Sequence, residues 1–410
     1  MKVFDNLEFQ IRRNLLALFT AGLLFWSGLA ALLPTLPLYM EDLGATKQQI
    51  GIVLGSFAIG MLLFRSLFGK LADRRGRKIV LLIGMLVNAI APLGYIVVQS
   101  IPGLMALRAF HGISIAAFTT GYLALVADLA PEKNRGEIMG YMSLVTPIGA
   151  AIGPALGGYL QAASGYTLLF LLSAGLAGIG LLCLVPIVNP PIHKQQQVDS
   201  NDSRFWQLLF SPRVRVLASI MLMIGLAFGA LHTFVPLFIK AAQVNLNPGL
   251  FYTVGALASF SVRFFTGKAS DRYGRGLFIT LSLVIYAVSM ILLWKASSAD
   301  IFLIAGVLEG AGSGILMPMI STVVADRALP QERGRVFSLC IMGLDVGIAI
   351  AGPVFGSVAE QVGYRNMFGF CAGLTVMALL IFLTKSNKNL SGSLRFALGR
   401  GKDAYSLNQS

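Results

Sequence analysis

Long stretches without a single charged residue dominate this chain. Asn14–Met40, Ile79–Leu107 and Ile138–Ile192 contain no Asp, Glu, Lys or Arg. A helix that crosses a bilayer needs about 20 apolar residues, so the third stretch is long enough for two crossings. The mean hydropathy is +0.76 and only 12% of the residues are charged, whereas about a quarter are charged in a soluble domain. These features predict an all-α integral membrane protein.

Twelve membrane-spanning helices fit this pattern. The predicted spans are roughly 14–38, 49–69, 79–99, 101–127, 137–160, 166–188, 214–239, 249–268, 276–295, 301–325, 335–359 and 365–384. Several of them contain Gly or Pro, which membrane helices tolerate better than soluble helices do. The strands of a β-barrel would instead be about 10 residues long and alternate in polarity.

An internal repeat divides the spans into two halves. The sequence GKLADRRGR at Gly69–Arg77 returns as GKASDRYGR at Gly267–Arg275, and the same offset relates Gly112 to Gly310. A shared offset at several landmarks indicates two diverged copies of one unit. Duplicated membrane units are typical of transporters, in which the substrate site lies where the two copies meet.

The repeat predicts the domain organisation. We expect an N-terminal bundle of six helices (1–188), a cytoplasmic linker (189–212), a C-terminal bundle of six helices (213–384) and a cytoplasmic tail (385–410). The linker is polar, and its composition predicts a solvated connection. The tail is basic and rich in Ser and Asn, so we expect it to lie against the anionic inner leaflet or to be disordered.

The net charge of +14 has an explanation that does not involve nucleic acid. If the N-terminus is cytoplasmic, most of the 32 Lys and Arg residues fall in the tails and the even-numbered loops. This asymmetry follows the positive-inside rule and places both termini in the cytoplasm. We therefore expect a monomeric, multi-pass protein of a bacterial cytoplasmic membrane, in contact with the lipid bilayer and binding no nucleic acid.

Three motifs stand out against this background. The loop after the second span reads GKLADRRGRK (69–78), the fourth span contains LMALRAFHG (104–112), and the fifth contains GAAIGPALGG (149–158). With these motifs the chain resembles the major facilitator superfamily over roughly residues 10–385. The resemblance implies two pseudo-symmetric bundles of six helices that work by alternating access. The fifth-span motif resembles that of the antiporter branch, which implies export of a drug or metabolite.

The repeated loop motif predicts a cytoplasmic gate. Gly69 and Gly76 are small enough for two helix ends to pack closely, and we expect Asp73 to bond to a neighbouring helix end while Arg77 pairs with Asp128. The counterparts in the second half are Asp271, Arg275 and Asp326. Such ion pairs hold one state of a bistable pair of bundles and break in the other. The alternative is a charged helix flank that only fixes orientation.

The fifth-span motif predicts a face of small residues. Gly149, Gly153 and Gly157 recur every four residues, so they share one helix face that permits close backbone approach. Pro154 interrupts the hydrogen-bond ladder and should kink the helix. Helix packing alone explains such a face. The functional hypothesis is that it meets a helix of the other half and seals one side of the cavity.

Few ionisable residues lie inside the spans, where a charge costs several kcal/mol unless it faces water or a partner. Arg108 and His111 share one face of the fourth span, and the repeat aligns His111 with Glu309 on the tenth. We predict an Arg108–Glu309 pair across the cavity. Asp345, on the eleventh span, has no cation nearby in the sequence. We expect these four residues to couple proton and substrate movement. A static ion pair, and for Asp345 a neutral hydrogen-bonded acid, are the alternatives.

The resemblance places the first, fourth, seventh and tenth helices around the cavity. Candidates for its lining are aromatic, amide or imidazole side chains, namely Phe25, Trp26, Asn88, Tyr122 and His232. An aromatic lining suits an amphipathic solute. Many proton-coupled drug antiporters of the family carry an acid on the first helix, and Asn14–Met40 has none. Either Glu309 or Asp345 takes that role, or transport is not coupled to protons.

No enzyme signature occurs in the chain: a Walker pattern, paired metal-ligand spacing and a nucleophile elbow are all missing. We expect neither a cofactor nor a metal site, so the energy must come from a gradient. The leading hypothesis is export of a small amphipathic drug or metabolite by proton antiport. Uptake or facilitated diffusion of a sugar or organic acid, and sensing or lipid flipping on the same fold, are the alternatives.

Overall fold

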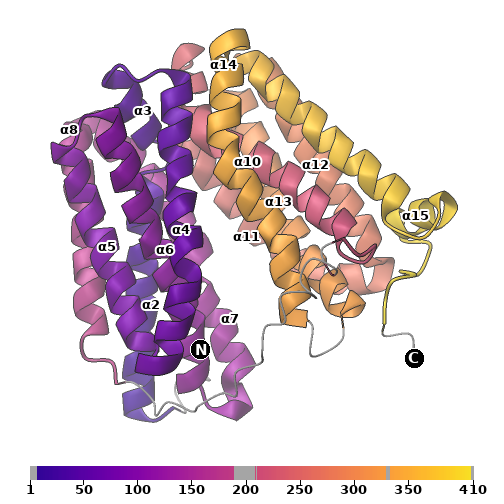
Figure 1. Cartoon of the computed structure of the whole chain (residues 1–410), viewed down its shortest axis with the longest axis horizontal. Helices are drawn as coiled ribbons and strands as arrows, with labels where there is room; N and C mark the ends of the chain where they lie inside the picture. Colours follow the sequence, from indigo (N-terminus) through magenta and orange to yellow (C-terminus); the bar gives the residue numbers. More distant parts are fainter. Residues whose placement is uncertain (1–6, 189–207, 209, 329–332, 408–410) are drawn as a thin grey trace. The chain divides into compact units, whose positions relative to one another are not determined.

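The structure is a computed structural model that describes residues 7–188, 208, 210–328 and 333–407, except the side chains of residues 264, 267, 268, 271 and 333–335. Every regular element in these ranges is a helix (Figure 1). The first half contains α2 (Phe9–Ala31), α3 (Leu36–Asp42), α4 (Lys47–Arg75), α5 (Arg77–Val97), α6 (Ile101–Leu129), η1 (Glu132–Asn134), α7 (Arg135–Ser143) and α8 (Val145–Leu184). The second half contains α10 (Arg215–Ala241), α11 (Pro248–Tyr273), α12 (Arg275–Lys295), α13 (Ala299–Arg327), α14 (Arg333–Lys385) and α15 (Leu390–Ala397).

Nine stretches of the described chain are long and apolar enough to cross a membrane. Two of them, Glu132–Leu184 and Val336–Lys385, contain 53 and 50 residues, more than twice the length of about 20 that one crossing needs. Each is interrupted by a glycine with a left-handed backbone, Gly165 at φ 78° and Gly363 at φ 79°. Both breaks lie where the sequence predicts a loop between two spans. The count of twelve spans stays a prediction.

The repeated loop motif forms the same sharp turn in both halves. Gly76 ends α4 and begins α5 with φ 92°, and Gly274 lies between α11 and α12 with φ 91°. Residues with a Cβ rarely adopt this backbone conformation, so the turn requires glycine. At Gly69, by contrast, an added Cβ would meet nothing within 4 Å in the described chain. The described chain thus shows no close packing at Gly69, and Gly76 acts through its backbone conformation.

Backbone contacts divide the chain into two compact units. Unit 1 contains α2 to α8 together with Asn247–Thr253, and unit 2 contains α10, the rest of α11 and α12 to α15. The predicted linker (189–212) falls mostly on residues outside the described ranges, so its boundaries stay predictions.

The glycine face of α8 packs inside unit 1. A Cβ at Gly149, Gly153 or Gly157 would collide with α2 between Trp26 and Ala31, so the absence of side chains allows the two helices to touch. The three glycines therefore meet α2 of the same half, while Pro154 and Gly158 of the same motif contact Gly249 and Asn247 at the start of α11. A role of this motif in sealing the cavity stays a prediction. Elsewhere on the same helix, near Pro154, the hydroxyl of Thr253 donates a hydrogen bond of 2.7 Å to the carbonyl of Ala151.

The C-terminal tail is folded as far as it is described. Asn389 caps α15 by accepting a hydrogen bond of 2.7 Å from the backbone of Gly392. Thr280 on α12 donates 2.9 Å to the carbonyl of Ala397, and the backbone of Leu407 donates 2.8 Å to the carbonyl of Asp326. The described part of the tail therefore folds back onto α12 and α13 and is not disordered, and its position against the inner leaflet stays a prediction.

Candidate coupling site and gate

A polar cluster lies in the interior of unit 1, between α5 and α6. His111 is fully buried, with Nε2 at 2.9 Å from Asn88 Oδ1 and Nδ1 at 3.1 Å from the Tyr95 hydroxyl. Because the Asn88 oxygen can only accept, Nε2 carries the hydrogen in this amide orientation and Nδ1 accepts from Tyr95. Both ring nitrogens of His111 thus have partners on α5, and the histidine joins α6 to α5.

Arg108 lies one turn before His111 on α6. Its residue exposure is 9%, its Nη1 approaches His111 Nδ1 at 3.4 Å, and its guanidinium carbon lies 4.2 Å from the ring centre of Phe57. Its Nε has no hydrogen-bond partner in the described chain. A buried cation with an unused donor is costly unless an anion reaches it. Arg108 is therefore suited to hold an anionic group of a substrate or a carboxylate.

Sequence reasoning did not identify Tyr95 or Phe57 as members of this cluster. Tyr95 follows Asn88 by two helical turns and shares its face of α5, so the spacing was the available signal. Phe57 comes from α4 and contacts Arg108 through its ring face. No spacing along the chain indicates a cation–π contact between separate helices.

Glu309 is the buried acid of unit 2. It lies on α13 with an exposure of 6%, and its polar neighbours are Tyr286 and Ser313. Its Oε1 has no hydrogen-bond partner in the described chain, nor has the hydroxyl of Tyr286. An ionised carboxylate in this position costs several kcal/mol unless water or a cation reaches it. The predicted Arg108–Glu309 pair would join the two units and stays a prediction.

The other predicted residues near the membrane centre are less buried. Asp345 on α14 is partly exposed, as are Trp26 on α2 and His232 on α10. The ring of His232 lies beside Phe228, with 4.0 Å between the ring centres. Trp26 and His232 therefore stay candidates for the cavity lining, and the coupling role of Asp345 stays a prediction for a partly exposed acid.

Three of the proposed lining residues belong to the interior of unit 1 instead. Phe25 is fully buried and stacks on Phe118 with 3.9 Å between ring centres. Tyr122 is 4% exposed, and its hydroxyl donates 3.2 Å to the carbonyl of Met142. Asn88 is fully buried against His111. These three side chains pack the bundle, so we withdraw them as lining candidates.

The loop motif of unit 1 holds an ion pair of the kind that the sequence predicts. Arg77 Nη1 lies 2.5 Å from Asp73 Oδ1, and Arg77 Nε lies 3.6 Å from Asp128 Oδ2. Asp73 thus contacts the arginine one turn further along. The side chain of Asp73 is 66% exposed and that of Asp128 is 44% exposed. Exposed pairs contribute about 0–1 kcal/mol, so this one can break without a large cost.

Unit 2 repeats the arrangement, since Arg275 pairs with Asp326. The side chain of Asp271, the counterpart of Asp73, lies outside the described residues. Both bundles therefore carry an arginine just after the glycine turn that pairs with an acid near the end of a following helix. The gate hypothesis predicts that these ion pairs break and form again during the transport cycle.

Comparisons with known proteins agree with this architecture. The chain is 27% identical over 394 residues to the staphylopine export protein of Staphylococcus aureus (strain Mu50), covering 92% of this chain and 98% of the relative. It is 25% identical over 380 residues to the quinolone resistance protein NorA of the same strain, covering 90% and 97%.

Solved structures show the same fold. A bacterial homologue of the human lysosomal transporter Spinster matches with a TM-score of 0.77 at 14% identity, covering 97% of this chain and 100% of that one. The nucleoside transporter NupG matches with a TM-score of 0.73 at 16% identity, covering 90% and 98%. The sequence profile of the Major Facilitator Superfamily matches residues 18–268 and 244–400. The chain therefore belongs to the Major Facilitator Superfamily and is a multi-pass membrane transporter, not an enzyme.

Proposed function

We propose that this transporter exports a small amphipathic solute across a bacterial cytoplasmic membrane in exchange for protons. The observation that carries the proposal is Glu309, a carboxyl group buried in a membrane helix with one oxygen that lacks a hydrogen-bond partner in the described chain. Ionising this carboxyl group costs much free energy in its buried position and little once water or a cation reaches it. Such a change suits proton exchange.

The relatives support export as the direction of transport. Two proteins that align with at least 90% of this chain are named for export and for drug resistance. Their names concern different solutes, staphylopine and quinolones, so they do not narrow the substrate of this chain. Partly exposed aromatic and imidazole groups at Trp26 and His232 favour a solute with an apolar body. Arg108 adds a cation that suits a solute carrying an anionic group.

In this proposal the four coupling residues have different tasks. Glu309 takes up a proton from the outer side and releases it to the cytoplasm as the bundles alternate. Arg108 stabilises the ionised carboxylate or the substrate anion, and His111 holds the face of α6 that carries Arg108. Asp345 is a second acid that can receive the proton.

Proton coupling can be tested in everted membrane vesicles. On addition of a transported dye to vesicles energised by a pH gradient, we expect an alkaline shift of the interior in step with dye uptake. Vesicles without the protein serve as the control. Substrate counterflow without any pH response would contradict antiport and favour facilitated diffusion.

The gate hypothesis predicts a kinetic effect without a loss of stability. Asp73→Asn removes a pair that contributes at most about 1 kcal/mol, enough to shift the balance of two states by about fivefold. We expect turnover to fall by several-fold while thermal stability in detergent stays unchanged. Arg74→Gln, at an exposed neighbouring position, is the matched control. Wild-type turnover of Asp73→Asn over the whole substrate range would exclude a gating role for this residue.

A further inference from the structure

A crevice of about 1000 Å³ opens in unit 2, at the end of the bundle that carries the tail. It lies between the first turns of α10, both ends of α14 and the start of the tail. Its volume is at the upper end of the range of about 300–1,000 Å³ that small-molecule sites occupy. The sequence motifs and the gate lie elsewhere, and none of the four coupling residues lines the crevice, although Asp345 lies between the lining residues Gly343 and Val346 in the sequence.

The inner walls of the crevice are apolar. Leu222 on α10 lines it together with Leu339 and Val346 on α14, and Gly343, also in the lining, lies against the backbone of Ala218. A side chain at Gly343 would push the two helices apart, so the crevice begins where their close contact ends. At the mouth lie two exposed apolar side chains, Phe210 and Leu390. Such walls accept hydrocarbon and give a soluble anion nothing to bind.

Three cations surround the mouth. Arg215 lies at the start of α10, Lys385 at the end of α14 and Lys388 at the start of the tail, and all three are exposed. No acidic side chain is among the described residues that line the crevice. No described lining residue neutralises the charges of these three side chains. Lys385 and Lys388 lie three residues apart at the junction of α14 and the tail, and Arg215 joins them from a segment that is distant in the sequence.

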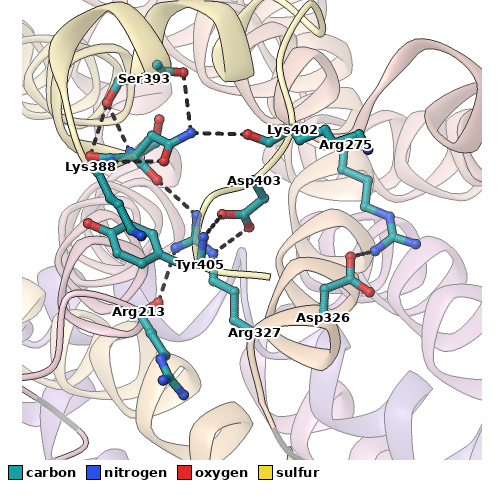
Figure 2. A network of polar contacts seen from close by, with 12 residues as sticks. Arg213, Arg275, Asp326, Arg327, Lys388, Ser393, Lys402, Asp403 and Tyr405 are labelled. Carbon is teal, nitrogen blue, oxygen red and sulfur yellow. Dashed lines mark hydrogen bonds and ion pairs between the residues drawn. The ribbon is translucent and has the colours of Figure 1, made fainter. Parts of the chain in front are cut away.

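The tail wall of the crevice is held in place by a buried arginine. Arg327, at the end of α13, donates hydrogen bonds to Asp403 at 2.6 Å, to the carbonyl of Arg213 at 3.1 Å and to the carbonyl of Ser386 at 2.9 Å. Figure 2 shows Arg327 between Asp403 and Arg213. Tyr405, which lines the crevice, follows Asp403 by two residues and lies over the same guanidinium. The wall is thus a fixed part of unit 2.

We propose that this crevice binds one anionic phospholipid from the leaflet on the tail side. The phosphate would lie among Arg215, Lys385 and Lys388, and an acyl chain would follow the apolar wall between α10 and α14. The distribution of charge along the chain predicts that this side is cytoplasmic, the side on which anionic lipids attract basic residues. Basic pockets between membrane helices on this side are suited to lipid headgroups.

The test is native mass spectrometry of the full-length protein in detergent, titrated with phosphatidylglycerol and separately with phosphatidylcholine. We expect one phosphatidylglycerol to bind with a preference on the order of tenfold or more, since each cation near an anionic headgroup adds to the attraction. The triple variant Arg215→Gln, Lys385→Gln, Lys388→Gln should lose this preference. If the wild-type protein binds phosphatidylglycerol and phosphatidylcholine equally well, the proposal is wrong.

Two controls separate a built site from general attraction. The triple variant Arg13→Gln, Lys133→Gln, Arg135→Gln removes the same charge from exposed positions of unit 1 and should keep the preference. If both triple variants lose the preference for phosphatidylglycerol to the same extent, the preference comes from the net charge of the protein, and the proposed site is wrong.

A third variant fills the crevice and leaves its charges in place. Ser219→Trp adds a large side chain on the α10 wall and should lower phosphatidylglycerol binding by about as much as the loss of the cations. If a folded Ser219→Trp variant binds phosphatidylglycerol as the wild type does, the acyl chain does not lie along this wall. If that variant does not fold, the two triple variants alone test the proposal. Inorganic phosphate in excess should not displace the lipid. Displacement would mean that the cations bind free anions and would contradict the lipid assignment.

Discussion

Arg327→Met is expected to destabilise the protein by about 3–5 kcal/mol, because it removes one partner of a buried ion pair. The side chain of Arg327 is 0% exposed and that of Asp403 is 10% exposed. Without the guanidinium, the carboxylate of Asp403 and the carbonyls of Arg213 and Ser386 lose their shared donor. The measurements are thermal unfolding in detergent and protease sensitivity of the tail, which should be cut much faster in the variant.

The neighbouring residue provides a matched control. Asp326 precedes Arg327 on the same turn of α13, but its pair with Arg275 is about a quarter exposed on each side. Asp326→Asn should therefore cost no more than about 1 kcal/mol. If both variants unfold at the same temperature, the buried Arg327–Asp403 pair contributes no more to stability than the partly exposed Arg275–Asp326 pair. The double variant Arg327→Met, Asp403→Leu should recover part of the loss, since it no longer leaves a buried charge unpaired.

The folded tail could not be predicted from its composition. Basic residues with Ser and Asn are also common in disordered tails, and the contacts that hold the tail are mostly to backbone carbonyls, which every residue offers. One signal was available. The repeat aligns Arg327 with Leu129, so the second half carries a charge at a helix end that the first half lacks. An unmatched charge in a duplicated fold indicates a partner outside the repeat, here Asp403.

The nine apolar stretches were predictable as membrane helices because hydropathy alone determines which stretches can cross a membrane. The breaks at Gly165 and Gly363 lie in the predicted loops even though the helices around them nearly merge. The first predicted span contains a turn at Leu32–Thr35 that we did not foresee. Pro34 and Pro37 were its signal, since proline disfavours helical backbone just before it.

The candidate site was predictable only in part, because charged residues indicate their partners in the sequence and aromatic residues do not. The Arg77–Asp128 and Arg275–Asp326 pairs follow from opposite charges at repeated positions. Aromatic residues carry no such information, because the same side chain can face lipid, a cavity or the interior of a bundle. Phe25 was expected in the cavity and stacks in the interior, whereas its neighbour Trp26 stays partly exposed.

Glu309→Gln is expected to abolish uphill transport, with at least a tenfold loss, while exchange down a gradient continues. The amide keeps the size of the side chain but cannot carry a proton, and exchange of substrate for substrate need not release one. Glu309→Asp keeps the acid and should retain part of the uphill activity. Asp345→Asn is the matched comparison on a partly exposed acid, and we expect a smaller loss there.

Thermal stability of the Glu309→Gln variant distinguishes two environments for the carboxyl group. If Glu309 acts alone, with Oε1 lacking a hydrogen-bond partner as in the described chain, the amide costs little and stability should change by no more than about 1 kcal/mol. If Arg108 is its partner in some state of the cycle, removal of the charge strands a buried guanidinium and lowers the stability of that state by several kcal/mol. Uphill transport by Glu309→Gln at the wild-type rate would remove Glu309 from the mechanism. The proton would then be carried by Asp345, or transport would not be coupled to protons.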